Sequence, residues 1–269
     1  MFRKNDSLKI KMPEQVPPGV AHAFEVLIPT CLTAIVVGAI GLVCQLATGA
    51  ELNAFIFNMV QKPLQSLIGD NIFAVAIMYV IISLFWRLGI HGNNMLAVVK
   101  EPIFRALLYA NTAAYTAHNE IPYVMNLTLL QMFGEFGGSG VTIGLVIAIF
   151  IFSKREDNRT IAGISIVPGL FNINETMIFG IPLVLNPILD IPFILAPVVI
   201  GYILVSSGFC PKIVLEVPWT MLPVILGFLA TGGHIMGAVS QLIVVAASTL
   251  IYIPFLIAYE KFQEKEAAE

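Results

Sequence analysis

The sequence predicts an all-α membrane protein, a multi-span helical bundle with re-entrant hairpins and broken helices. Its 269 residues are 58% hydrophobic and 12% charged, whereas a soluble domain carries about 25% charged residues. The mean hydropathy is +0.88. Several apolar runs approach the roughly 20 residues that a spanning helix needs. Between residues 171 and 187, amides, prolines and one carboxylate interrupt the apolar sequence, which indicates irregular backbone at membrane depth.

Charge and cysteine content exclude other classes of protein. The formal net charge of -3 arises from a few short charged stretches, so no nucleic-acid partner is expected. The cysteines are odd in number and lack metal-ligand spacing, so we interpret them as small buried hydrophobic residues; they are Cys31, Cys44 and Cys210. No metal and no cofactor is predicted.

The chain divides into a basic cytoplasmic segment at 1–20, a transmembrane domain at 21–260 and a charged tail at 261–269. No apolar run directly follows the basic residues 1–11, so they do not form a signal peptide. The first span is predicted at 24–48, which only Glu25 and Gln45 interrupt. Basic residues at 3–11 and 154–159 place both regions in the cytoplasm.

Apolar residues recur at helical spacing between about 50 and 68, beside polar ones. This pattern predicts an amphipathic helix in the membrane interface; the alternative is a connector helix packed on protein. Residues 71–90 form the second predicted span. Residues 142–152 form a third, which must extend backward through the preceding glycines to reach the needed length.

Two shorter candidates at 191–207 and 217–230 contain prolines, and 234–259 is the last and most uniformly apolar span. Charged residues interrupt 90–136 too often for an ordinary span, so a re-entrant segment is predicted at about 92–120. A second re-entrant segment is predicted at about 160–187. No inverted repeat between two halves of the chain helps to locate a site.

The segment 171–187 predicts a binding site. Glu175 has no basic residue nearer in sequence than Arg159, so at membrane depth its carboxylate must face protein, water or a ligand. Pro182 and Pro187 remove backbone donors and Gly180 adds flexibility, which predicts broken helices that meet in an irregular loop.

A second polar cluster follows the apolar run that ends near residue 88. His91 lies between Gly89 and Gly92, which permit close approach of a ligand. Imidazole can both donate and accept hydrogen bonds; the alternative is a helix-ending histidine bonded to a carbonyl. Trp86 either anchors the chain at the membrane interface or stacks on the apolar face of a sugar.

Several motifs in this order strongly resemble the lactose/cellobiose-type IIC permeases, the membrane components of the bacterial phosphoenolpyruvate-dependent sugar phosphotransferase system. They include Gly-Ile-His-Gly-Asn-Asn at 89–94, Gly-Gly-Ser-Gly at 137–140 and Asn-Ile-Asn-Glu-Thr at 172–176. Further matching stretches lie at 9–21, 178–187, 217–220, 229–233 and 252–255. The resemblance covers nearly the whole chain.

The chain departs from the family pattern in two ways. Family members are longer, and the segment at 9–21 lies in their middle, so the resemblance is to their C-terminal, substrate-binding half without the first several helices. Thr176 stands where the family usually has proline, which predicts a less rigid loop around Glu175.

The resemblance implies a multi-pass protein of the bacterial cell membrane, surrounded by lipid and homodimeric when complete. It implies that a β-linked disaccharide is translocated and phosphorylated on its 6-hydroxyl. It implies that the phosphoryl donor is a phosphocysteine on a cytoplasmic IIB protein, and that a IIA protein supplies the phosphoryl group to IIB. The implied catalytic pair is His91 and Glu175. The implied or plausible sugar-binding residues are Trp86, Asn93, Asn94, Asn172, Asn174 and Trp219.

Phosphoryl transfer requires mainly positioning and charge control, which this residue set can provide. Glu175 can orient or deprotonate the attacking hydroxyl, and His91 can hydrogen-bond that hydroxyl or the phosphoryl group. Asparagines read hydroxyls, but they also cap broken helices. Gln131 and Glu135 are further candidates, with solvation in the membrane interface as the alternative.

Two other functions are compatible with these residues. The chain could be a truncated, non-catalytic membrane fragment of such a permease. It could also be an ion-coupled secondary sugar carrier in which Glu175 binds the coupling ion.

Overall fold

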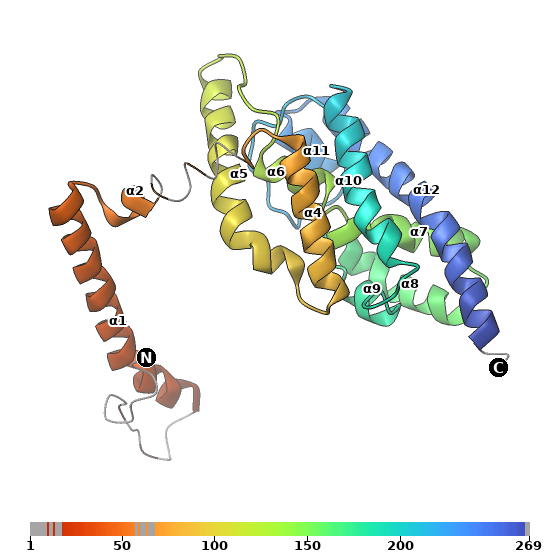
Figure 1. Cartoon of the computed structure of the whole chain (residues 1–269), viewed down its shortest axis with the longest axis horizontal. Coiled ribbons are helices and arrows are strands. Elements are labelled where there is room, and N and C mark those ends of the chain that lie inside the picture. Colours follow the sequence, from red (N-terminus) through yellow and green to blue (C-terminus); the bar gives the residue numbers. More distant parts are fainter. Residues whose placement is uncertain are drawn as a thin grey trace. The chain divides into compact units, whose positions relative to one another are not determined.

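The computed structural model describes residues 10, 13, 18–56, 59, 63 and 68–266. The chain forms two compact units, Met1–Pro63 and Leu64–Glu269, and each is described by itself (Figure 1). The first unit contains α1 (Pro18–Thr48) and α2 (Leu52–Ile56). Most apolar side chains of α1 are exposed within this unit, as in a helix that faces lipid.

The predicted span at 24–48 lies within α1. Pro29 is inside this helix, and the hydroxyl of Thr33 donates to the Pro29 carbonyl at 2.7 Å. α2 covers only part of the predicted amphipathic helix at 50–68. Most of the rest of that helix and most of the basic segment 1–20 lie outside the described residues, so both expectations stay predictions.

The second unit contains a row of three packed helices: α4 (Ile72–Arg87), α10 (Asp190–Ser206) and α12 (Ile235–Glu266). α10 packs between α4 and α12 (Figure 1). The Asn71 side chain caps α4 by accepting from the backbone N–H groups of Phe73 at 2.9 Å and Ala74 at 3.3 Å. The three helices coincide with the apolar stretches at 71–90, 191–207 and 234–259, and that α4 and α10 cross a membrane stays a prediction.

α12 also continues through residues 261–266, which the sequence places in the charged tail. α7 (Ile143–Phe152) packs against α12. Two helices in the described part of the chain are long and apolar enough to cross a membrane: Phe24–Thr48 within α1 and Ile235–Lys265 within α12.

Two predicted spans differ from the structure. α7 does not extend backward into a full span, because the residues before it form only the short 3-10 turn η4 (Ser139–Val141). Gly137, Gly138 and Gly140 there have positive φ angles, which a helix cannot accommodate. In 217–230 only α11 (Ile225–Ala230) is helical. Pro218 and Pro223 explain this, because each lacks the backbone donor that a helix needs.

The predicted re-entrant regions contain one long helix and one broken pair. α5 (Gly92–Thr116) is a single helix with Pro102 inside, and Figure 1 shows that it is bent. A loop leads from it to α6 (Leu127–Phe133). α8 (Glu156–Leu170) and α9 (Glu175–Gly180) are separated by residues 171–174, as the polar segment predicts. That either region re-enters a membrane stays a prediction.

The close approach of α7 to α12 depends on Gly144. A Cβ atom at this position would lie 2.4 Å from the Ser248 hydroxyl and 2.6 Å from its backbone carbonyl carbon. By contrast, a Cβ at Gly201 in α10 would meet no atom within 4 Å. The two glycines therefore provide a matched pair, one at a tight helix contact and one in open space.

We expect Gly144→Ala to destabilise the protein by about 1–3 kcal/mol, because the contact becomes overpacked. Gly201→Ala should be neutral or stabilise it by up to about 1 kcal/mol, because alanine favours helix. The measurement is the temperature at which half of the detergent-purified protein leaves its monodisperse gel-filtration peak. Equal behaviour of the two variants would contradict the tight packing of α7 on α12.

Candidate functional site

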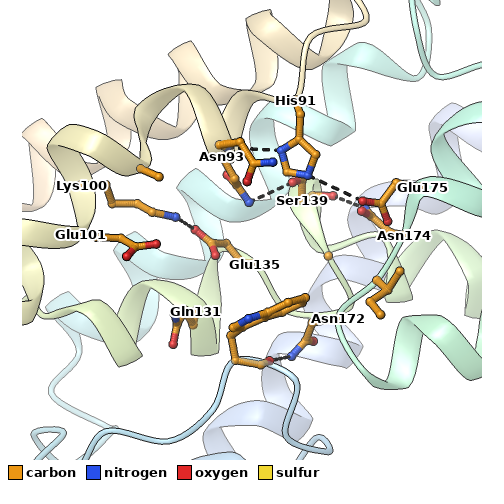
Figure 2. A pocket seen from close by; sticks show the side chains of 15 residues that line it. His91, Asn93, Lys100, Glu101, Gln131, Glu135, Ser139, Asn172, Asn174 and Glu175 are labelled. Atoms are coloured by element: carbon orange, nitrogen blue, oxygen red, sulfur yellow. Dashed lines mark hydrogen bonds and ion pairs between the residues drawn. The ribbon is translucent and has the colours of Figure 1, made fainter. Parts of the chain in front are cut away.

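A polar cavity of about 320 Å³ lies among the start of α5, the end of α6, the loop before α9 and residue 219. Figure 2 shows its side chains. The volume falls in the range typical of small-molecule sites. Seven of the eight site residues named from the sequence line it: His91, Asn93, Asn94, Asn172, Asn174, Glu175 and Trp219. The eighth, Trp86, does not.

His91 caps the beginning of α5. Its Nδ1 accepts a hydrogen bond from the backbone N–H of Asn94 at 3.3 Å, so in the neutral imidazole the proton is on Nε2. Nε2 lies 3.6 Å from Oε1 of Glu175. The alternative of a helix-ending histidine bonded to a carbonyl therefore does not apply. His91 starts a helix and directs its remaining donor toward the carboxylate.

Glu175 is the first residue of α9, where the helix dipole favours a negative charge. Its side chain is 46% exposed and that of His91 is 36% exposed, so both groups can be reached from the cavity. Thr176 occupies the next position of the helix. The first N–H groups of a helix have no intrahelical partner, so threonine and proline are equally compatible with the hydrogen bonding of this turn.

The loop before α9 is fastened to the glycine loop, which comprises residues 137–140. The Asn172 side chain accepts from the Gly137 N–H at 2.7 Å and donates to the Trp219 carbonyl. The Asn174 amide donates to the Ser139 carbonyl at 2.8 Å and to the Thr142 hydroxyl at 2.8 Å. These amides are therefore engaged in holding the loops, although both residues line the cavity.

Ser139 connects this loop to the residues around His91. Its hydroxyl oxygen accepts from Nε1 of Trp86 at 2.9 Å and from the Asn93 amide at 3.1 Å. The Trp86 ring is 3% exposed and its centroid lies 4.4 Å from that of His91. Such burial does not fit a membrane-interface anchor. The indole supports His91 from behind, and a direct contact with sugar stays a prediction.

Further contacts join the segment before His91 to the segment after Glu175. The Arg87 Nε lies 2.9 Å from Oδ2 of Asp190, and the Arg87 carbonyl accepts from the Leu185 N–H at 3.1 Å. Arg87 ends α4, shortly before His91, whereas Leu185 and Asp190 follow α9, which carries Glu175. These contacts link the two chain segments that hold the histidine and the carboxylate.

Sequence reasoning missed Lys100, which forms a hydrogen-bonded ion pair with Glu135. Lys100 is 4% exposed and the Glu135 side chain is 15% exposed. Solvation in the interface is therefore not the role of Glu135. Gln131 and Glu101 line the same part of the cavity. The available signal was the set of opposite charges that interrupts the apolar sequence of 90–136.

Trp219 lies in the irregular segment between α10 and α11 and is 49% exposed. It lines the cavity, so its ring is available to a ligand. Asn94 is also exposed at the cavity. In the described part of the chain, no group of three or more histidine, cysteine or acidic residues could hold a metal ion.

Comparison with known proteins identifies the family. Residues 1–197 match the family model described as "Phosphotransferase system, EIIC". The chain belongs to this family. The resemblance noted from the sequence motifs is thus confirmed.

Two relatives show the extent of the similarity. The chain is 37% identical over 269 residues to the oligo-beta-mannoside-specific EIIC component of Bacillus subtilis (strain 168). This match covers 97% of this chain and 61% of that protein. It is 37% identical over 283 residues to a cellobiose-specific EIIC component of Lactococcus lactis subsp. lactis (strain IL1403), with 96% and 57% covered. The EIIC chain described here therefore spans about three fifths of the length of these relatives.

A solved structure shares the fold. The crystal structure of ChbC, the IIC component of the N,N'-diacetylchitobiose-specific phosphotransferase system, matches with a TM-score of 0.77 and 33% identity. The match covers 99% of this chain and 62% of that one. The prediction of an all-α membrane protein with broken helices is confirmed.

Replacement of Ser139 tests whether its hydroxyl holds the site together. Ser139→Ala should lower the stability by about 1–3 kcal/mol, because the buried donor of Trp86 and the half-buried donor of Asn93 lose their acceptor. It should also change the tryptophan emission spectrum. Both effects are measured in detergent, by thermal unfolding and fluorescence.

Ser165 is the matched control, because it is buried and its hydroxyl has no hydrogen-bond partner within the described residues. Ser165→Ala should be neutral or stabilising and leave the emission unchanged. If the two variants gave the same melting temperature and spectrum, Ser139 would not be the connecting residue.

Proposed function

We propose that this EIIC chain forms the substrate-binding part of a sugar phosphotransferase permease, which takes up a β-linked disaccharide and phosphorylates it. The observation that carries the proposal is the convergence of the His91 donor and the Glu175 carboxylate, 3.6 Å apart, at a polar cavity in a membrane fold. The names of its relatives support the substrate class, because they are specific for oligo-beta-mannoside, cellobiose or lactose.

The geometry supports a role for both groups at the acceptor hydroxyl. A hydroxyl placed beside the pair can donate its hydrogen to Oε1 of Glu175 and accept from Nε2–H of His91. In the transfer, the sugar oxygen forms a bond to phosphorus while the bond from phosphorus to the IIB cysteine sulfur breaks. The cysteine leaves as thiolate, and the hydroxyl proton passes to Glu175. Alignment of this kind contributes roughly 7–11 kcal/mol to lowering such barriers.

Trp219 provides a half-exposed aromatic surface at the same cavity, which suits the apolar face of a pyranose ring. The protein partners in this proposal are a cytoplasmic IIB protein and, through it, IIA. The membrane partner is the lipid around a multi-pass protein of the bacterial cell membrane. The complete protein would be a homodimer.

The test is sugar phosphorylation by membranes that contain the chain. They are supplied with phosphoenolpyruvate, the general phosphotransfer proteins, a cognate IIA and IIB, and a panel of β-linked disaccharides. A parallel sample co-expresses the N-terminal part of the oligo-beta-mannoside relative. Sugar phosphate in either sample supports the proposal. Product in the first sample would mean that this chain is sufficient for catalysis, and product in the second sample alone would mean that catalysis also needs the N-terminal part.

The remaining outcomes separate the alternatives. Accumulation of free, unmodified sugar driven by an ion gradient would indicate a secondary carrier. Absence of both sugar binding and product in the two samples would indicate a non-catalytic fragment and overturn the proposal.

Glu175→Gln should reduce phosphorylation at least a thousandfold without loss of membrane insertion, because the amide cannot take the proton. The measurement is the rate of sugar-phosphate formation in the active sample, normalised to the amount of inserted protein. Glu120→Gln is the control, since Glu120 is exposed and does not line the cavity. Normal product formation by Glu175→Gln would remove this residue from the reaction.

A further inference from the structure

The cavity has a second polar end, away from the catalytic pair. Figure 2 shows Lys100, Glu101, Glu135 and Gln131 grouped apart from His91 and Glu175, with Asn93 and Ser139 between them. Lys100 is nine residues beyond His91 on α5, a distance of about 13 Å along a helix axis. One pyranose ring at the catalytic pair would therefore leave this second end for another group.

The second end retains unused hydrogen-bonding capacity. A lysine ammonium has three donors, and within the described residues Lys100 uses one, toward Oε1 of Glu135. Oε2 of Glu135 accepts no hydrogen bond from the described residues. The Gln131 amide has none either, and Glu101 uses only Oε2, which accepts from Arg105 at 3.3 Å. In contrast, the amides of Asn172 and Asn174 are engaged by the loops.

A buried ion pair is weak evidence for stability, because the desolvation of both charges offsets their attraction. The pair of Lys100 and Glu135 is more readily explained by recognition. A donor beside an acceptor matches two neighbouring hydroxyls of a sugar, each of which can donate and accept.

The charges at this end also restrict what can bind. The pair of Lys100 and Glu135 is neutral in sum. The network of Glu101, Arg105 and Glu216 has two carboxylates for one guanidinium and is negative. A further negative group on the ligand would therefore be repelled.

We propose that Lys100, Glu135, Gln131 and Glu101 form a second-ring subsite. It holds the sugar ring that is not phosphorylated, reads a neutral pair of hydroxyls on it, and rejects a ring that carries a carboxylate. This inference rests on the proposed function, because it assigns the disaccharide to one cavity with the reacting ring at His91 and Glu175.

The experiment measures binding by intrinsic fluorescence, since the only two tryptophans of the sequence, Trp86 and Trp219, lie at or behind the cavity. The probes are a neutral β-linked disaccharide, the methyl β-glycoside of its reacting ring, and the same disaccharide with a uronic acid as the second ring. The neutral disaccharide is the sugar of the phosphorylation panel that changes the fluorescence of the wild type at the lowest concentration.

The main variant is Lys100→Met combined with Glu135→Gln, which removes both charges and leaves neither unpaired. Its affinity for the neutral disaccharide should fall at least about tenfold, the effect of one or two charged hydrogen bonds. Its affinity for the monosaccharide should stay within about twofold, which also reports that the variant is folded. Glu101→Gln should improve binding of the uronic acid disaccharide by about threefold or more, relative to the neutral one.

Arg155→Gln combined with Asp157→Asn is the matched control. It removes an ion pair of 2.6 Å that does not line the cavity, and it should change none of these affinities. If the main variant does not fold, Gln131→Ala provides the same comparison with the ion pair intact. It should weaken disaccharide binding about threefold or more and leave the monosaccharide unaffected.

Equal losses for disaccharide and monosaccharide would show that the pair only supports the fold and would overturn the subsite. So would unchanged affinities, or a uronic acid disaccharide that binds wild type as well as the neutral one. These outcomes leave the proposed function intact, because wild type still binds sugar. Failure of wild type to bind any sugar of the panel would overturn the subsite and the proposed function together.

Discussion

The site depends on the hydrogen bonds that join the glycine loop to the loop before α9. Asn174 lies so close to Gly138 that a Cβ on this glycine would be 2.1 Å from the Asn174 side-chain carbon, so no other residue fits there without displacement. The contact fixes the position from which α9 begins, and therefore that of Glu175. Through Ser139, the same loop also holds Trp86 and Asn93 on the His91 side.

The fold could be predicted where apolar length and helix breakers agreed. The helices α1, α4, α10 and α12 follow from long apolar runs, and the break before α9 follows from the polar residues of 171–174. The prediction failed where the helix is shorter than the apolar sequence suggests. In α7 the positive φ angles of the glycine loop end the helix, and composition alone does not reveal whether a glycine adopts such an angle. Beside α11, two prolines outweighed the apolar character of 217–230.

The pairing of His91 with Glu175 could be predicted from chemistry and resemblance, since a carboxylate and a glycine-flanked histidine are unusual in apolar sequence. The hydrogen-bond partners of the asparagines could not be predicted in this way. An amide that reads a hydroxyl and one that holds a loop look alike in sequence, and only the partners of Asn172 and Asn174 distinguish them. Lys100 was missed because the value of one charge depends on its partner 35 residues away.

The contacts of Arg87 with Asp190 and with Leu185 have a consequence for the proposed transport. They join the segment before His91 to the segment after Glu175, so that the two groups belong to a single clamp. In the proposed function, a displacement of this clamp would carry both groups and the sugar hydroxyl between them as one body. The reacting geometry would then be preserved while the cavity changes the side to which it opens, and alignment would not have to be rebuilt in each cycle.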